Sequence, residues 1–292
     1  MNIQTISGWE DYELLDSGEG QRLERFGKYT IMRPDPQAIW RPLQSKSLWA
    51  GADAVFERLT SSKGKWNVKG KMPEKWIVKY KDLSFWVRLT PFKHTGLFPE
   101  QAIQWDWIVS HVAKALRDKK KNMNILNLFG YTGAATIAAA AAGAKVTHVD
   151  ASRPAIGWAR ENQTASKLEQ KPIRWLIDDA LKFTAREARR GVQYDGIIMD
   201  PPIYGHGPEG EPWDFNKDLP KLLQNCSLIL SADPAFILIN AYAISSSALM
   251  LQNVLADYVK DMGGTIDVGE LAIKEKHTER LLSTGIYGRW SR

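Results

Sequence analysis

Asn127-Leu128-Phe129-Gly130-Tyr131-Thr132-Gly133 begins at the end of a mostly apolar run, residues 125–128, and is followed by an alanine-rich run, residues 134–142. The short apolar run is typical of a buried strand and the alanine-rich run of a helix, so the two glycines fall in a strand-to-helix turn. Such a turn brings main-chain N–H groups and the positive end of a helix toward a ligand. This heptapeptide therefore predicts an α/β fold with a ligand site at the carboxyl end of the strand.

The same alternation of strand, turn and helix continues toward the C-terminus. It predicts a Rossmann-like, doubly wound, mostly parallel sheet with helices on both faces. A final antiparallel hairpin would close this sheet and bring it to seven strands. The expected strands are 125–128, 145–149, 173–176, 196–199, 235–239, 265–273 and 283–290, and the expected helices are 100–117, 134–142, 152–167, 180–190, 219–230 and 246–262.

The first third of the chain has a different pattern. Short extended pieces, broken by glycine and proline, run from residue 12 to residue 40, and strand-like stretches resume at residues 76–80 and 83–89. Helical periodicity is missing from both parts. We therefore expect an N-terminal β-rich domain, residues 1–98, followed by an α/β domain, residues 99–292.

Composition excludes several classes of protein. Hydrophobic residues make up 44% and charged residues 25% of the 292 residues, which is the range of soluble globular domains. The one cysteine, Cys226, cannot form an internal disulfide, and no Cys/His cluster has the spacing of a zinc site, so no metal is expected. No apolar signal core and no run long enough to span a bilayer are found, which predicts a cytoplasmic protein that does not enter membranes.

Candidate cofactor ligands follow the first two predicted strands. Glycines in the bend would let a ligand approach the main chain, and an acid after the second strand could accept two hydrogen bonds from ribose hydroxyls. The Gly-x-x-Gly spacing differs from the Gly-x-Gly-x-x-Gly of dinucleotide sites, which weighs against a dinucleotide. A simple tight turn is the alternative. The candidates are Phe129, Gly130, Tyr131, Thr132 and Gly133 in the bend, and Asp150, Ala151 and Ser152 after the second strand.

Two more motifs follow the third and fourth strands, namely Asp178-Asp179-Ala180 and Asp200-Pro201-Pro202-Ile203-Tyr204. The carboxyl ends of parallel strands meet at one crevice, so the cofactor ligands expected there also include Asp178, Asp179, Ala180 and Asp200. Asp179 suits an adenine amino group, because a carboxylate only accepts hydrogen bonds and that amino group only donates them. The alternative for one of the two acids is a helix N-cap, and Asp178 is the candidate for that role. The two prolines leave few N–H donors, so Asp200 and nearby carbonyls could face a substrate nitrogen. A proline-rich loop without function is the alternative.

Taken together, these motifs resemble those of the class I S-adenosylmethionine-dependent methyltransferases. More narrowly, they resemble the bacterial 23S ribosomal RNA large-subunit methyltransferase group, whose catalytic domain carries Asn-Leu-Phe-x-Tyr-Thr-Gly. Residues 94–101 are also similar to the Lys-Thr-Gly-Phe-Phe-x-Asp-Gln segment that these enzymes place ahead of that domain. The resemblance covers residues 76–262. It implies S-adenosyl-L-methionine as the cofactor, a methyltransferase domain at 99–292 and a substrate-recognition domain at 1–98.

The chain departs from that group in its nucleophile. Relatives that methylate C5 of cytosine use a cysteine after the fifth strand, since C5 is not nucleophilic until a thiolate adds to C6. Here residues 240–245 contain no thiol, and Cys226 falls in the preceding predicted helix among leucines, which favours burial. Methylation of an amine or of another ring atom is therefore expected. Residues 1–75 show no match to the RNA-binding module of some relatives.

The expected catalytic residues are Asp200, Pro201, Pro202 and Tyr204. Asp200 and the carbonyl of Pro201 would orient the nucleophile, and Tyr204 would offer a ring face on which an extruded base could stack. For Tyr204 the alternative is a loop aromatic that packs on its own domain.

RNA, and ribosomal RNA in particular, is the expected partner. Residues 61–93 carry a net charge of +7 from nine basic and two acidic residues, interleaved with aromatic rings that could stack on bases. A solvated β face over an aromatic interior is the alternative for this region. A methyltransferase that acts on a small molecule or a protein is a second possible function. A non-catalytic protein that binds a nucleotide or RNA is a third. Arg189-Arg190 and residues 119–121 are interpreted as solvated helix ends. The sequence predicts neither the oligomeric state nor the target nucleotide. The basic residues are Lys63, Lys65, Lys69, Lys71, Lys75, Lys79, Lys81, Arg88 and Lys93, and the aromatic ones are Trp66, Trp76, Tyr80, Phe85, Trp86 and Phe92.

Overall fold

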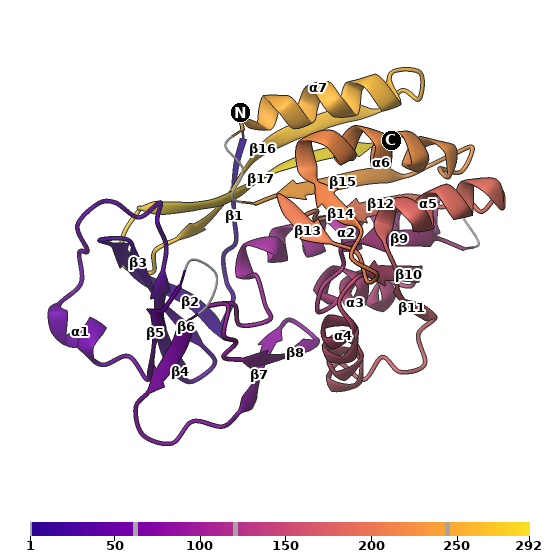
Figure 1. The fold of residues 1–292 in the computed structure, drawn as a ribbon. Coiled ribbons are helices and arrows are strands. Elements are labelled where there is room, and N and C mark those ends of the chain that lie inside the picture. The colour runs from indigo at the N-terminus through magenta and orange to yellow at the C-terminus, as the bar shows by residue number, and fades with distance from the viewer. Residues whose placement is uncertain (1, 61–63, 119–121, 243–245) are drawn as a thin grey trace. The chain divides into compact units, whose positions relative to one another are not determined.

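The computed structural model describes residues 2–60, 64–118, 122–242 and 246–292 (Figure 1). They form two compact units. The sheet unit comprises Met1–Gln4, Ile103–Leu271 and Thr284–Arg292, and the N-terminal unit comprises Thr5–Ala102 and Ala272–Ser283. The sequence pattern places residues 272–283 with the α/β domain, whereas the structure groups them with the N-terminal unit.

The large sheet has eight strands in the part of the chain that the structure describes, in the order β1-β16-β17-β15-β12-β9-β10-β11. The five central and outer strands from β15 to β11 are parallel, and β17 runs antiparallel to β15. All seven expected strands are present. The eighth, β1, was not predicted, and the side chain of Asn2 donates a 2.8 Å hydrogen bond to Asp267 of β16. The strands are β1 (Asn2–Thr5), β9 (Asn124–Leu128), β10 (Lys145–Asp150), β11 (Ile173–Ile177), β12 (Gly196–Met199), β15 (Phe236–Ala241), β16 (Thr265–Lys274) and β17 (Leu281–Ser291).

Alternate residues of the central strands pack into two separate cores, because side chains in a strand point to opposite faces. In β12, Ile197 and Met199 join the core formed with α5, α6 and α7, whereas Ile198 joins the core formed with α2 and α3. Helices thus cover both faces of the sheet, which confirms the predicted α/β class. Among the described residues no helix is long and apolar enough to cross a membrane. The helices are α2 (Ala102–Arg117), α3 (Ala134–Ala141), α4 (Arg153–Ala165), α5 (Ala180–Arg189), α6 (Phe215–Leu228) and α7 (Ala248–Val259).

The N-terminal unit is β-rich, as expected. Its five-stranded sheet has the order β2-β3-β4-β5-β6, and β7 and β8 form a separate antiparallel hairpin. Inside the unit, the buried carboxylate of Glu24 accepts a 2.6 Å hydrogen bond from Nε of Arg33 and one of 2.9 Å from the hydroxyl of Tyr12. Its elements are β2 (Tyr12–Gly18), β3 (Gln21–Phe26), β4 (Tyr29–Pro34), α1 (Lys46–Ala50), β5 (Ala54–Arg58), β6 (Gly64–Val68), β7 (Lys75–Tyr80), β8 (Leu83–Arg88) and the 3-10 turn Pro99–Gln101.

The turn between β16 and β17 completes this N-terminal unit. Leu14 of β2 forms an isolated bridge with Glu275, and the main-chain N–H of Lys276 donates to the carbonyl of Leu14 at 2.8 Å. The hydroxyl of Ser17 also donates to the buried Glu275 carboxylate at 2.6 Å. These contacts account for the assignment of residues 272–283 to a unit that is far away in sequence.

Candidate active site

Three main-chain hydrogen bonds join the carboxyl ends of the four neighbouring strands β12, β9, β10 and β11. The N–H of Asp200 donates to the carbonyl of Leu128 at 3.4 Å, that of Gly130 to Val149 at 3.2 Å, and that of Asp178 to Asp150 at 3.2 Å. The structure therefore brings the four sequence motifs together along one edge of the sheet.

The bend after β9 has an uncommon backbone. Phe129 and Tyr131 have φ angles of 54° and 50°, in the left-handed region that residues other than glycine rarely adopt. Gly133 has a φ of 82° and caps α3, so glycine is favoured there on conformational grounds. Such strained main chain persists only where the surrounding structure holds it, and it is concentrated at functional sites.

Gly130 is required for a different reason, which is the close approach of His148. A Cβ atom added to Gly130 would lie 2.3 Å from Cε1 of His148, a distance that real Cβ atoms do not reach. His148 is fully buried on β10, and burial lowers the pKa of its imidazole to about 3. The ring is therefore neutral at physiological pH and supports the bend by packing.

A small polar network orients that ring. The Nδ2 of Asn127 donates to Oγ1 of Thr136 at 2.8 Å, and Oγ1 of Thr136 lies 2.9 Å from Nδ1 of His148. The threonine oxygen has two lone pairs, so its contact with Nδ1 orients the ring in either tautomer of the neutral imidazole. His148 was not among the residues predicted from the sequence motifs. Its signal was its position two residues before Asp150, on the same side of the strand.

Asp150 binds the bend directly. Its Oδ2 accepts the main-chain N–H of Tyr131 at 2.8 Å, and its Oδ1 accepts that of Ser152 at 2.7 Å. Ser152 in turn caps α4 through its side chain, and Ala151 lies between the two in partly exposed main chain. Burial raises the pKa of the Asp150 carboxyl, against the lowering effect of these two N–H donors.

The two acids after β11 have separate structural partners. Asp179 is the N-cap of α5, where its Oδ1 accepts from the N–H of Lys182 at 2.8 Å. Asp178 forms an ion pair with Arg186. The suggestion that Asp178 is the cap was therefore wrong, because Asp179 is the residue that directly precedes the helix at Ala180. Oδ2 of Asp179 faces Gly207, where an added Cβ would lie 3.0 Å away.

A small hairpin that the sequence did not predict follows the Asp200-Pro201-Pro202 turn. It consists of β13 (Tyr204–His206) and β14 (Pro212–Asp214). The indole N–H of Trp213 donates to the carbonyl of Pro202 at 2.7 Å, and its ring packs on Phe129 at a centroid distance of 4.8 Å. The hairpin thereby connects the proline turn to the bend after β9. Tyr204 is 73% exposed, so its ring does not pack on its own unit.

The arrangement contains no accessible thiol among the described residues. Cys226 is the only cysteine of the chain, and it is fully buried in α6, where burial raises the pKa of its thiol. In the stretch 240–245, Oδ1 of Asn240 accepts a 2.9 Å hydrogen bond from Gln104, and residues 243–245 lie outside the described residues. Across the described ranges no group of three or more His, Cys, Asp or Glu could hold a metal ion.

The residues at this edge suit S-adenosylmethionine. Gly130 has no side chain, so the bend packs against His148 and keeps its left-handed backbone at this edge. Each oxygen of Asp150 accepts one N–H bond and retains a further lone pair for a ribose hydroxyl. Asp179 uses one oxygen as a cap and keeps the other as an acceptor for an exocyclic amine.

A doubly wound sheet with this glycine bend and these acids at its carboxyl edge is typical of class I methyltransferases. Residues 45–256 match the S-adenosylmethionine-dependent methyltransferase family, and the chain belongs to this family. It is a methyltransferase whose cofactor is S-adenosylmethionine.

Solved structures agree with this assignment. A crystal structure of the S-adenosylmethionine-dependent methyltransferase from Agrobacterium tumefaciens is 43% identical, with a TM-score of 0.95 over 100% of this chain and 93% of that one. A protein described as a methyltransferase and solved with S-adenosylhomocysteine shares the fold, at 18% identity and a TM-score of 0.76, over 97% of this chain and 76% of that one.

A curated relative is more distant and much longer. The ribosomal RNA large subunit methyltransferase K/L of Shewanella frigidimarina is 32% identical over 158 residues. That alignment covers 53% of this chain and 21% of the relative, so the chain spans about a fifth of its length.

Proposed function

We propose that this protein transfers a methyl group from S-adenosylmethionine to a base of ribosomal RNA. The bound cofactor supplies an electrophilic methyl group on a sulfonium centre. The relative from Shewanella, which is named for ribosomal RNA, supports this substrate. The observation that carries the proposal is a basic and aromatic face on the β7–β8 hairpin of the N-terminal unit, which serves in substrate recognition.

Register defines that face. Lys75 pairs with Arg88, Ile77 with Trp86 and Lys79 with Ser84, and the intervening residues of both strands are buried. Nζ of Lys75 lies 4.4 Å from the ring centroid of Trp86, and Ile77 is 40% exposed. Cations beside a partly exposed aromatic ring can bind phosphates while a base stacks on the ring. We define Lys75, Lys79, Trp86 and Arg88 as the hairpin face.

The rest of the basic region contributes less than its composition suggests. Trp76, Tyr80 and Phe85 are core residues of the hairpin's other side, so the expectation that they could stack on bases was wrong. Lys65 pairs with Glu57 at 3.2 Å, and Nζ of Lys69 donates to the carbonyl of Ala50 at 2.5 Å. Phe92 is 53% exposed. Lys63 lies outside the described residues.

Residues at the edge of the large sheet would act on the nucleophile. The carboxylate of Asp200 and the carbonyl of Pro201 orient an amine or ring nitrogen, and Pro202 is fixed through Trp213. The exposed ring of Tyr204 is available to stack on an extruded base. The buried thiol of Cys226 takes no part, so cytosine C5 is not the proposed target.

The test is methyl transfer from tritiated S-adenosylmethionine to RNA, protein and small-molecule fractions of a strain that lacks the gene. Label should enter ribosomal RNA, and nucleoside analysis would then identify the methylated base. Label in the protein or small-molecule fraction alone would overturn the proposal and favour the other substrate classes.

The hairpin face is tested by charge reversal. Lys79→Glu should weaken RNA binding several-fold and lower its salt dependence by about one released counterion, with S-adenosylhomocysteine affinity unchanged. The matched control is Lys46→Glu, an exposed position at the start of α1 with the same change of charge. Equal losses in both variants would show that net charge acts, not this face.

A further inference from the structure

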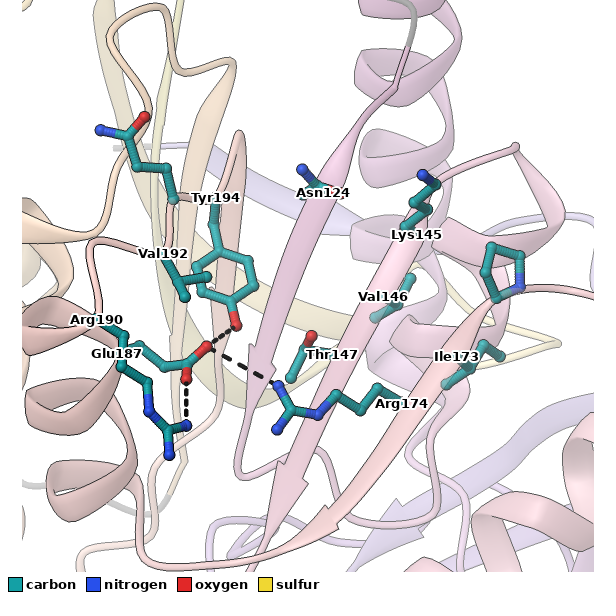
Figure 2. A pocket seen from close by; sticks show the side chains of 12 residues that line it. Asn124, Lys145, Val146, Thr147, Ile173, Arg174, Glu187, Arg190, Val192 and Tyr194 are labelled. Atoms are coloured by element: carbon teal, nitrogen blue, oxygen red, sulfur yellow. Dashed lines mark hydrogen bonds and ion pairs between the residues drawn. The ribbon is translucent and has the colours of Figure 1, made fainter.

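A pocket of about 610 Å³ lies at the opposite edge of the large sheet (Figure 2). Its walls are the amino ends of β9, β10 and β11, at Asn124, Lys145 to Thr147 and Pro172 to Arg174, together with the end of α5 and the segment that follows it. Since parallel strands share their direction, this edge is separate from the one that holds Asp150 and the glycine bend.

The floor of the pocket holds a buried carboxylate. Glu187 is only 1% exposed, and its Oε2 accepts a 2.8 Å hydrogen bond from the hydroxyl of Tyr194. Two guanidinium groups approach it, with Nη1 of Arg190 at 3.4 Å and Nη1 of Arg174 at 4.0 Å. Figure 2 shows all three groups converging on Glu187 from two different walls. A buried carboxylate is costly unless it is paired, so Glu187 attracts both guanidinium groups to the pocket.

The arginines have donors to spare. Their side chains are 54% and 57% exposed, and each guanidinium has five N–H groups, of which Glu187 can use only some. With Lys145, the lining carries three cations against the single carboxylate of Glu187, which leaves a charge of +2. The interpretation of Arg190 as a merely solvated helix end was therefore incomplete.

Part of the lining is apolar. Val146, Ile173 and Val192 line the pocket beside the charged groups, and its volume is in the range of sites for small molecules, roughly 300–1,000 Å³. A matching ligand has a compact anionic end and a body that can lie against aliphatic side chains. A phosphomonoester carries nearly two negative charges at neutral pH, and its oxygens fit the forked donors of arginine.

We propose that this pocket binds a small phosphomonoester of nucleotide size, with the phosphate held by Arg174 and Arg190. The site is independent of methyl transfer. Glu187 and Tyr194 are positioning residues that keep the two guanidinium groups convergent.

Calorimetry of the full chain with uridine 5′-monophosphate tests this proposal, with saturating S-adenosylhomocysteine present to block the cofactor site. The nucleotide should bind, inorganic phosphate should bind more weakly, and uridine should not bind, because the phosphate supplies the charge contacts. Absence of binding by the nucleotide, or equal binding of uridine, would overturn the assignment.

Variants locate the site. Arg174→Gln and Arg190→Gln should each weaken nucleotide binding by about tenfold, the effect of losing a charged hydrogen bond. Both side chains are more than half exposed, so the fold should survive. Arg189→Gln is the matched control, since Arg189 is exposed next to Arg190 at the end of α5 and does not line the pocket. Equal losses in all three variants would contradict the proposal.

Discussion

The imidazole of His148 fills the space that a side chain on Gly130 would need, with Cε1 2.3 Å from the position of the missing Cβ. Burial lowers the pKa of His148 to about 3, so an uncharged ring supports the bend. The adjacent residues Phe129 and Tyr131 have positive φ angles, and the bend cannot relax without disturbing this contact.

Gly130→Ala should destabilise the protein and weaken S-adenosylhomocysteine binding, because forcing a methyl group into a packed site costs about 1–3 kcal/mol. Thermal unfolding and calorimetry measure the two effects. Gly157→Ala is the control, since an added Cβ at this α4 position has no neighbour within 4 Å. It should stabilise the protein by about 0.4–1 kcal/mol, as expected for a helical glycine. A fully stable Gly130→Ala protein with normal affinity would refute the packing argument.

Cofactor affinity should fall as the pH is lowered through the pKa of Asp150. Burial raises this pKa in the free protein, whereas ribose hydroxyls that donate to the carboxylate would lower it in the complex. The complex then binds fewer protons than the free protein, so protonation opposes binding by up to about tenfold per pH unit below the pKa. Calorimetry between pH 8 and pH 5 checks this. Asp150→Asn should bind weakly without that pH dependence; an identical profile in both proteins would exclude Asp150.

Asp200→Ala should abolish methyl transfer and leave S-adenosylhomocysteine affinity within about twofold, because its carboxylate is assigned to the nucleophile and not to binding energy for the donor. Asp200→Asn, which keeps the shape and one acceptor oxygen, should retain partial activity. Single-turnover transfer and calorimetry separate the two quantities. Normal turnover in the alanine variant would eliminate the proposed role.

Trp213→Phe should lower the rate of transfer more than it lowers stability. The change removes the N–H donor to the carbonyl of Pro202, a loss of about 0.5–1.5 kcal/mol, and frees the proline turn. Trp290→Phe is a matched control, because the indole of Trp290 donates a similar 2.8 Å bond to Gly263 in a different part of the unit. The two variants should have comparable stability, but the Trp213→Phe variant should transfer methyl groups more slowly than the Trp290→Phe variant. Equal turnover in the two variants would argue against a role of the fixed proline turn.

The elements that the sequence predicted well are those with strong local signals. Buried parallel strands such as β12 are continuous apolar runs, and α4 and α5 begin directly after side chains that cap them, Ser152 and Asp179. Because parallel strands point the same way, the order of motifs along the chain was enough to place their ends at one edge.

The elements that it missed depend on contacts between distant residues. The three-residue strands β13 and β14 are too short for a periodic signal, and their hairpin is held by Trp213 reaching back to Phe129 and Pro202. β6 has no buried residue, so no apolar alternation marks it. His148 acts on the bend after the neighbouring strand, and its position two residues before Asp150 does not by itself reveal that contact.

The location of residues 272–283 bears on how the protein is made. A unit that begins at Thr5 is completed only by a turn that includes Glu275, so its native contacts cannot all form until nearly the whole polypeptide has left the ribosome. Vectorial synthesis normally lets an N-terminal domain fold first. In this protein the early segment must wait, and a gene fragment ending near residue 102 would encode an unfinished structure.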